Sequence, residues 1–178
     1  MARKKYVDNA VAPIIAWDFD GTINVNGEGK FPECGEVRRF TREVLNFLHD
    51  IGCKNVIWTS RDVAYNQEEK RMYDDLTPML NFLDENDIEY DAINKSVQFA
   101  PFHYNGRKVY AHLYVDDRAF GWHESNSIMA DILVHILTDI IGIEEAYAIC
   151  IRNDLLNGRS INLKEYAKDA VRSWAEDK

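Results

Sequence analysis

The stretch Ile14-Ile15-Ala16-Trp17-Asp18-Phe19-Asp20-Gly21-Thr22 decides the fold that we expect for this chain. Apolar residues are followed by two carboxylates and then by Gly-Thr, which is the pattern of a buried strand that ends in a turn. Because side chains of a strand alternate between its faces, Asp18 and Asp20 are expected to point the same way, with Phe19 in the core. Gly21 lets the chain turn away from this point without a side chain in the way.

Two carboxylates that point at one place repel each other unless a cation lies between them. Hard oxygen ligands of this kind suit Mg²⁺. In open α/β sheets, ligands bind at the carboxyl ends of the strands, which is where Asp18 and Asp20 are expected. The stretch therefore predicts an Mg²⁺ site at one edge of a sheet.

Length, composition and charge are those of a globular chain. It has 178 residues, enough to bury a proper core, and its apolar fraction of 46% is ordinary. The net charge of −9 argues against long polynucleotide partners, because wrapping nucleic acid needs a basic face; a small phosphorylated substrate stays open. The three cysteines, Cys34, Cys53 and Cys150, show no close pairing, which favours a reducing cytosol over disulfides or a zinc site.

The most apolar segment, residues 128–143, does not predict a membrane span. Asp131, His135 and Asp139 interrupt it, and it is too short and too polar to cross a bilayer. These polar residues recur every four positions, and we interpret them as the solvated face of an amphipathic helix rather than as a metal site. We therefore expect a cytoplasmic protein without membrane contact.

Apolar runs and helical periodicities alternate along the chain, which predicts a parallel sheet with right-handed crossovers. The fold class is accordingly α/β, a Rossmann-like parallel sheet with helices on both faces. Strands are expected at 13–19, 55–58, 90–93 and 113–115, and helices at 35–51, from about 66, and from Pro78 with Thr77 as cap.

The chain divides into a core over residues 1–121 and a helical extension over 122–178. The extension is expected to form two or three helices, although residues 146–151 could instead be an edge strand. Its apolar face, between Ile128 and Ile140, must be buried against the sheet or in a homo-oligomer.

Polar groups follow three of the expected strands. Asp18 and Asp20 end the first, Thr59-Ser60 follows the second, and Asp116-Asp117 follows the last. Parallel strands bring these ends to one edge of the sheet, so residues far apart in sequence are expected to converge there. With a lysine nearby, they make a candidate site.

Together these segments resemble the motifs of the haloacid dehalogenase (HAD) superfamily of aspartyl-phosphate hydrolases. Asp18-Phe19-Asp20-Gly21-Thr22 resembles the first motif, Ile57-Trp58-Thr59 the second, and Val115-Asp116-Asp117-Arg118 the fourth. Lys95 is the candidate for the third motif, and Lys108 competes with it. The resemblance covers roughly residues 14–121 and leaves the carboxyl-terminal third outside.

The segment Ile23 to Glu36 is too short for the cap domain that many members of this superfamily carry. No room for a cap exists between the strand at 90–93 and Lys95 either. The chain therefore resembles cap-less members, such as small phosphatases of bacteria and phages.

The resemblance implies an Mg²⁺-dependent phosphomonoesterase, a hydrolase in which Asp18 is the nucleophile and becomes an aspartyl-phosphate. Asp20 would protonate the leaving oxygen and later deprotonate the hydrolytic water. The metal would be held by Asp18, by the backbone carbonyl of Asp20 and by Asp116. Asp117 would reach the metal through water or hold Lys95 by hydrogen bonds.

Phosphate binding is assigned by the same resemblance. Thr59 would donate a hydrogen bond to a phosphate oxygen, with amides of the turn at Ser60 helping; alternatively it caps a helix. Lys95 would neutralise Asp18 and a phosphate oxygen, unless it is a solvated loop lysine. Arg61 and, less so, Arg118 are candidate substrate contacts, and either could instead form a structural ion pair.

A nucleotide or a nucleic-acid end is a candidate substrate by analogy with relatives of the superfamily. An aromatic set would either stack on a nucleobase or pack the loop against the sheet: Phe99, Phe102, His103 and Tyr104. The alternative function is a catalytically silent HAD scaffold that serves as a binding or assembly module.

Overall fold

The structure is a computed structural model, and it describes residues 12–25, 31–97, 108–119 and 121–161. Its elements in chain order are β1 (Ile14–Asp18), β2 (Asn24–Val25), β3 (Glu36–Val37), α1 (Thr41–Asp50), β4 (Lys54–Trp58), β5 (Val63–Asn66), β6 (Arg71–Asp74), α2 (Leu76–Glu85), β7 (Ala92–Ile93), β8 (Leu113–Val115), α3 (Ile128–His135), a π-helical segment η1 (Ile136–Ile141) and α4 (Glu145–Leu156). The aromatic set at Phe99, Phe102, His103 and Tyr104 lies outside the described residues.

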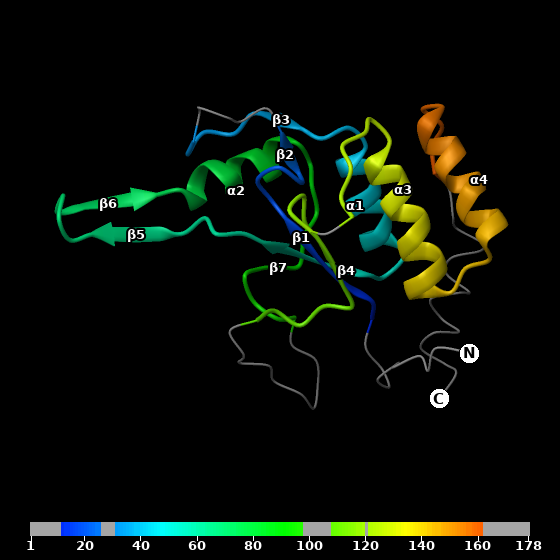
Figure 1. Ribbon diagram of the computed structural model, residues 1–178, viewed down its shortest axis with the longest axis horizontal. Helices are drawn as coiled ribbons and strands as arrows, with labels where there is room; N and C mark the ends of the chain where they lie inside the picture. The colour runs from blue at the N-terminus through cyan, green and yellow to red at the C-terminus, as the bar shows by residue number, and fades with distance from the viewer. Residues whose placement is uncertain (1–11, 26–30, 98–107, 120, 162–178) are drawn as a thin grey trace.

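The central sheet has four parallel strands in the order β7-β4-β1-β8. In this register Asp18 pairs with Trp58 and Trp17 pairs with Val115, so the strands β1, β4 and β8 end at the same edge. The predicted Rossmann-like α/β sheet is therefore confirmed (Figure 1). Any group that follows one of these strands begins at that common edge.

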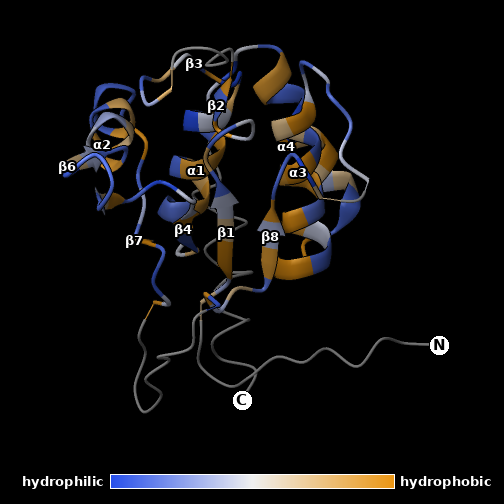
Figure 2. Cartoon of the chain, turned by 60° about the vertical axis from the view of Figure 1, so that its left-hand side comes forward, coloured by the Kyte–Doolittle hydropathy of each residue, from blue (hydrophilic) through white to orange (hydrophobic). Residues whose placement is uncertain are grey.

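The core lies on both sides of β1, whose first four residues are buried. Ile15, Trp17 and Phe19 belong to the larger hydrophobic cluster, together with the buried residues of all the described helices. Ile14 belongs to a smaller cluster whose other buried members are Val56 and Val109. In Figure 2, β1, β8 and much of α3 carry the hydrophobic colour. Helices flank the sheet, as expected, and their buried apolar residues all belong to the larger cluster. Among the described residues, the smaller cluster contains only strand and loop residues.

The carboxyl-terminal region is helical, as predicted. α3, η1 and α4 follow β8, and the residues at 146–151 lie within α4, so the alternative of an edge strand there is wrong. Ile128, Leu133, Ile136 and Leu137 are buried in the larger cluster, which gives the apolar face a partner within the same chain. No helix among the described residues is long and apolar enough to cross a membrane.

A β-hairpin replaces the helix that we expected from about residue 66. β5 and β6 pair in antiparallel fashion and project away from the body of the molecule (Figure 1). The Asn66 side chain accepts hydrogen bonds from the amides of Glu68 and Glu69, and Lys70 has a φ of 52°. These features close a tight turn, and a local side-chain-to-backbone turn of this kind competes with a helix.

Two helices begin at different residues from those expected. α2 starts at Leu76, and the carboxylate of Asp74 accepts hydrogen bonds from the amides of Leu76 and Thr77 and from the Thr77 hydroxyl. Asp74 is thus the capping side chain, and Thr77 lies in the first turn. α1 starts at Thr41 rather than near Gly35, because the intervening β3 pairs with β2.

Candidate functional site

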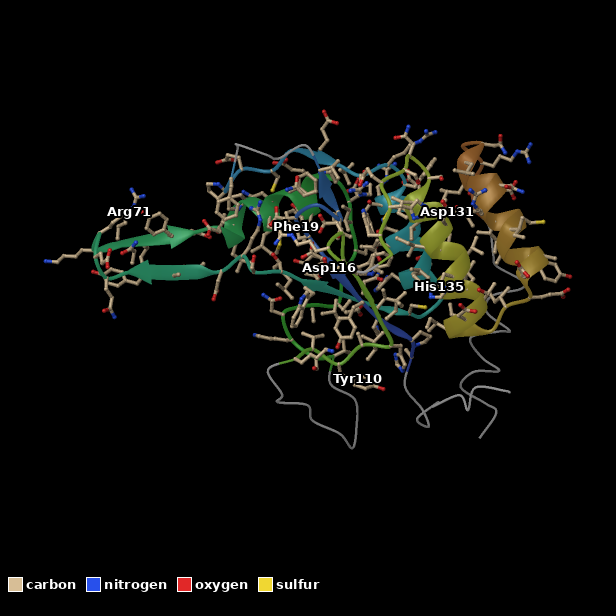
Figure 3. The ribbon with its side chains drawn as sticks, in the orientation of Figure 1. Phe19, Arg71, Tyr110, Asp116, Asp131 and His135 are labelled. Carbon is tan, nitrogen blue, oxygen red and sulfur yellow. The ribbon has the colours of Figure 1, made fainter. Side chains whose placement is uncertain are left out.

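Three carboxylates meet at the carboxyl edge of the sheet. Asp18 ends β1, and Asp116 and Asp117 directly follow β8. One carboxylate oxygen from each residue lies within 4.8 Å of the others, and we call these three residues the acid cluster. Figure 3 labels Asp116 in this cluster and Phe19 on the turn after β1. The convergence predicted from the strand ends is therefore observed for these three residues.

The acid cluster carries more negative charge than its surroundings balance. The pKa of Asp18 is raised from 3.8 to about 7, first by burial and then by the charges of Asp116, Asp117 and Asp20, against a backbone hydrogen bond that lowers it. Among the described residues, Asp117 Oδ1 is buried without a hydrogen-bond partner. A divalent cation among these oxygens would offset the repulsion between the carboxylates and give Asp117 Oδ1 a partner. A hard all-oxygen donor set fits Mg²⁺.

Gly21 and Thr22, which follow β1, connect Asp18 to the Asp116-Asp117 part of the acid cluster. The amide of Asp117 donates to Thr22 Oγ1 over 2.9 Å, and this hydroxyl lies 3.5 Å from Asp18 Oδ2. Gly21 has a φ of 92°, and a Cβ there would lie 2.3 Å from Asp117 Oδ2. Only glycine allows the turn after β1 to lie against the Asp117 carboxylate.

Arg38, which the sequence analysis missed, ties this turn to the segment after β8. Its guanidinium donates to the carbonyl oxygens of Thr22 and Gly21 and forms an ion pair with Glu124. It also lies over the Trp122 ring, 5.3 Å from the centroid. Arg38 is buried in a connection between β3 and α1, and no motif distinguishes it from other loop arginines.

Asp20 lies apart from the acid cluster and has its own partners. Arg61 Nε donates to Asp20 Oδ2 and a terminal nitrogen donates to Oδ1, both over 2.8 Å. Asn24 Nδ2 adds a 3.0 Å hydrogen bond to Oδ1. A bidentate guanidinium contact is among the strongest that a carboxylate makes, so Asp20 is fixed in place.

Arg61 is buried between two aromatic rings. Its guanidinium carbon lies 5.1 Å from the centroid of Phe19 and 5.0 Å from that of Phe31. Further donors reach the carbonyl oxygens of Pro32 and Asp75, and only 1% of the side chain is exposed. The structure places Arg61 as the ion-pair partner of Asp20, with its donors already engaged.

The other sequence candidates are less closely joined to the acid cluster. The Thr59 hydroxyl accepts the amide of Arg61, and the Thr59 backbone is held through both its amide and its carbonyl by the side chain of Asn94. Lys95 is exposed and forms no ion pair with a described residue, while Lys108 Nζ lies over the Tyr114 ring. Neither lysine is shown in contact with Asp18, so the choice between them stays a prediction.

A groove of about 830 Å³ opens beside the acid cluster. Asp117 and Asp20 belong to its lining, with Phe31 from the connection between β2 and β3, Ser60 after β4, and Arg118 after β8. These residues come from four separate connections, those after β1, β2, β4 and β8. The groove is therefore the space into which a molecule docked at the acid cluster would extend.

Comparisons with known proteins give one structural relative. No protein-family model and no curated protein match the chain. A solved structure of a conserved protein from Bacteroides thetaiotaomicron is similar, with 26% identical residues, a TM-score of 0.52, and coverage of 73% of this chain and 93% of that one. Fold and site together define a Rossmann-like α/β protein with a candidate acidic metal centre.

Proposed function

We propose that this chain is an Mg²⁺-dependent phosphomonoesterase of the HAD type that works through an aspartyl-phosphate on Asp18. The observation that carries the proposal is the acid cluster itself, three carboxylate oxygens within 4.8 Å at the end of the central strand. Its residues are those of the first and fourth motifs that resemble the superfamily. The similarity to the Bacteroides protein supports the fold on which this site is built.

Asp18 is the proposed nucleophile because it ends the central strand and is the one carboxylate of the cluster that β1 itself holds. Asp18, Asp116 and Asp117 would hold the Mg²⁺. When bound, the ion supplies the positive charge that lets a carboxylate approach an anionic phosphate. Ionised Asp18 then attacks phosphorus, and the bond to the leaving alcohol breaks.

Asp20 is the proposed general acid and base, and Arg61 positions it. A carboxylate oxygen has about two acceptor sites, and Asp20 Oδ1 uses both, on Arg61 and Asn24. Oδ2 accepts only the Arg61 Nε among the described donors. Oδ2 is therefore the oxygen we expect to deliver the proton to the leaving alcohol and to take one from the hydrolytic water.

The test is hydrolysis of p-nitrophenyl phosphate and a panel of phosphomonoesters by the full chain, with Mg²⁺ and with a chelator. We expect Mg²⁺-dependent turnover that Asp18→Asn lowers by at least about 10³-fold, because the nucleophile is lost. Asp84→Asn, an exposed acid on α2, is the matched control and should leave the rate unchanged.

A folded chain that gains thermal stability from Mg²⁺ but cleaves none of the panel would contradict the enzyme hypothesis. That outcome would instead support the catalytically silent scaffold.

A further inference from the structure

We infer that the groove beside the acid cluster selects phosphomonoesters whose leaving alcohol carries a planar ring, as a mononucleoside does, and that Phe31 and Arg118 make this selection. The inference rests on the proposed function, because it takes the phosphoryl group to dock at the acid cluster. It adds the substrate class and two specificity residues outside the chemical machinery.

The groove has the size and position for such a leaving group. Its volume of about 830 Å³ falls within the range of small-molecule sites, roughly 300–1,000 Å³. Asp117 belongs both to the acid cluster and to the groove lining. A substrate with its phosphorus at the acid cluster would thus place the rest of the molecule between Ser60, Phe31 and Arg118.

Phe31 has the properties of a stacking platform. Its side chain is 61% exposed, which is unusual for a large aromatic ring, and it lines the groove. The ring is also held in place, because it lies on the Arg61 guanidinium that Asp20 and two carbonyl oxygens fix. A planar base stacks on such a ring with little loss of side-chain freedom, whatever the base is.

Arg118 supplies a guanidinium that forms no ion pair with any described residue. Its amide donates to Asp116 Oδ1 over 2.8 Å, which fixes its backbone beside the acid cluster. The side chain is exposed and pairs with no described carboxylate, whereas Arg38 in the same groove is paired with Glu124. A guanidinium in this position can bind ribose hydroxyls or cover the second face of a planar ring.

The charge of the chain favours a mononucleotide over the end of a long nucleic acid. Arg118 is the one exposed cation among the described residues that line the groove, and the chain as a whole carries a net charge of −9. Polynucleotides gain most of their affinity from rows of cations along the backbone. A mononucleotide needs only the phosphate site, the ring platform and one cation.

The experiment compares kcat/KM for a nucleoside 5′-monophosphate and for glycerol phosphate, which has no ring. Phe31→Leu, which keeps an apolar cover over Arg61 without a ring, is expected to lower the nucleotide value about tenfold, mainly through KM, and to leave glycerol phosphate within about twofold. Arg118→Gln should lower the nucleotide value about three- to tenfold. Phe31→Trp should retain it, because the larger ring still stacks.

Two further variants separate stacking from structure. Phe31→Ala removes the cover over Arg61 as well as the ring, and it should lower kcat/KM for both substrates, for the nucleotide more than for glycerol phosphate. Tyr65→Ala removes a comparably exposed ring, 56% exposed, from the projecting hairpin and should change neither substrate. A phosphorylated oligonucleotide should be a poorer substrate than the mononucleotide.

The inference and the proposed function fail in different ways. If the parent chain hydrolyses both substrates equally well and the Phe31 variants change neither rate, the inference is overturned while the phosphatase assignment stands. If the parent chain cleaves none of the nucleotide, glycerol phosphate and p-nitrophenyl phosphate, the proposed function fails and the inference fails with it. If the oligonucleotide is preferred, the mononucleotide assignment is wrong.

Discussion

Asp18 and Asp20 stand two residues apart in one motif, yet their surroundings are opposite. Asp18 lies with two other acids, and no described cation pairs with it. Asp20 accepts two hydrogen bonds from Arg61 and one from Asn24. β1 ends at Asp18 and Asp20 already belongs to the turn, so strand alternation does not extend to it. Asp18 therefore has no cationic partner among the described residues, whereas Asp20 has Arg61 of the same chain.

Gly21→Ala should give the largest combined effect on activity and stability, because Gly21 connects these two environments. The new Cβ would lie 2.3 Å from Asp117 Oδ2 on a backbone with φ 92°. We expect phosphatase activity to fall by at least about 10²-fold and the free energy of unfolding to fall by about 2–3 kcal/mol. Steady-state kinetics and urea denaturation measure the two effects.

Gly121→Ala is the matched control for this substitution. Gly121 has a φ of 93°, and a Cβ there would meet nothing within 4 Å. Gly121→Ala should lower the free energy of unfolding by only about 1 kcal/mol, from backbone strain, and should largely retain activity. Equal losses in the two variants would mean that the contact with Asp117 is not what requires glycine at position 21.

Arg61→Met should leave the Asp20 carboxylate without its ion-pair partner and destabilise the chain. It removes the bidentate partner of Asp20 and buries an apolar side chain in its place, between Phe19 and Phe31. We expect a loss of about 3 kcal/mol in the free energy of unfolding, at the lower end for a broken buried pair because 38% of the Asp20 side chain is exposed.

A double-mutant cycle with Asp20→Asn tests the cause of this loss. If the ion pair is responsible, the double variant should recover a substantial part of the loss, since no unpaired carboxylate remains. Strict additivity of the two single variants would assign the loss to packing instead. Urea denaturation at neutral pH with a chelator present is the measurement.

Asp18→Asn should stabilise the chelator-treated protein, in contrast to Arg61→Met. We expect the free energy of unfolding to rise by on the order of 2 kcal/mol at pH 8. The folded pKa of Asp18, about 7, lies above its ordinary 3.8, so the folded state binds a proton more tightly than the unfolded state. Stability of the parent chain is therefore lost as the pH rises from about 4 to about 7.

The gain from Asp18→Asn should accordingly be small at pH 4.5 and complete above pH 7. Thermal denaturation across this range measures it, and Asp20→Asn should destabilise the chain at pH 8. If Asp18→Asn instead destabilises the chain at pH 8 without metal, burial and repulsion from the neighbouring carboxylates do not disfavour ionised Asp18 in the folded state.

Mg²⁺ should give the smallest effect. At a free concentration ten times its dissociation constant, it should stabilise the parent chain by about 1.4 kcal/mol. Asp116→Asn should reduce this gain because it removes one of the three oxygen donors, while Asp84→Asn should keep it. An equal Mg²⁺ response in the parent chain and in Asp116→Asn would place the ion elsewhere.

Those parts of the fold that follow from buried apolar runs could be predicted from the sequence. The four parallel strands and the helical carboxyl-terminal region were predicted because continuous apolar runs and helical periodicity mark them. The hairpin β5–β6 could not be, since it is exposed and its turn depends on the Asn66 side chain and a positive φ at Lys70. Neither feature leaves a hydrophobic pattern.

The candidate site shows the same limit. Asp18, Asp116 and Asp117 were identified because each follows a predicted strand, and their meeting follows from parallel topology. Arg38 and Asn94 were missed because their roles depend on partners far away in the sequence. For Arg61 the structural ion pair was one of the two predicted alternatives, but its partner Asp20 was missed for the same reason. The roles of Thr59 and Lys95 remain predictions.

The acid cluster draws its members from two segments that are 98 positions apart, Asp18 and Asp116. At a synthesis rate of about 5–20 residues per second, the ribosome finishes the second segment roughly 5–20 s after the first. A nascent chain therefore contains Asp18 several seconds before it contains Asp116 and Asp117, the other two members of the acid cluster. Under the proposed function, the Mg²⁺ site and the reaction at Asp18 would become possible only after β8 and the segment that follows it have been synthesised.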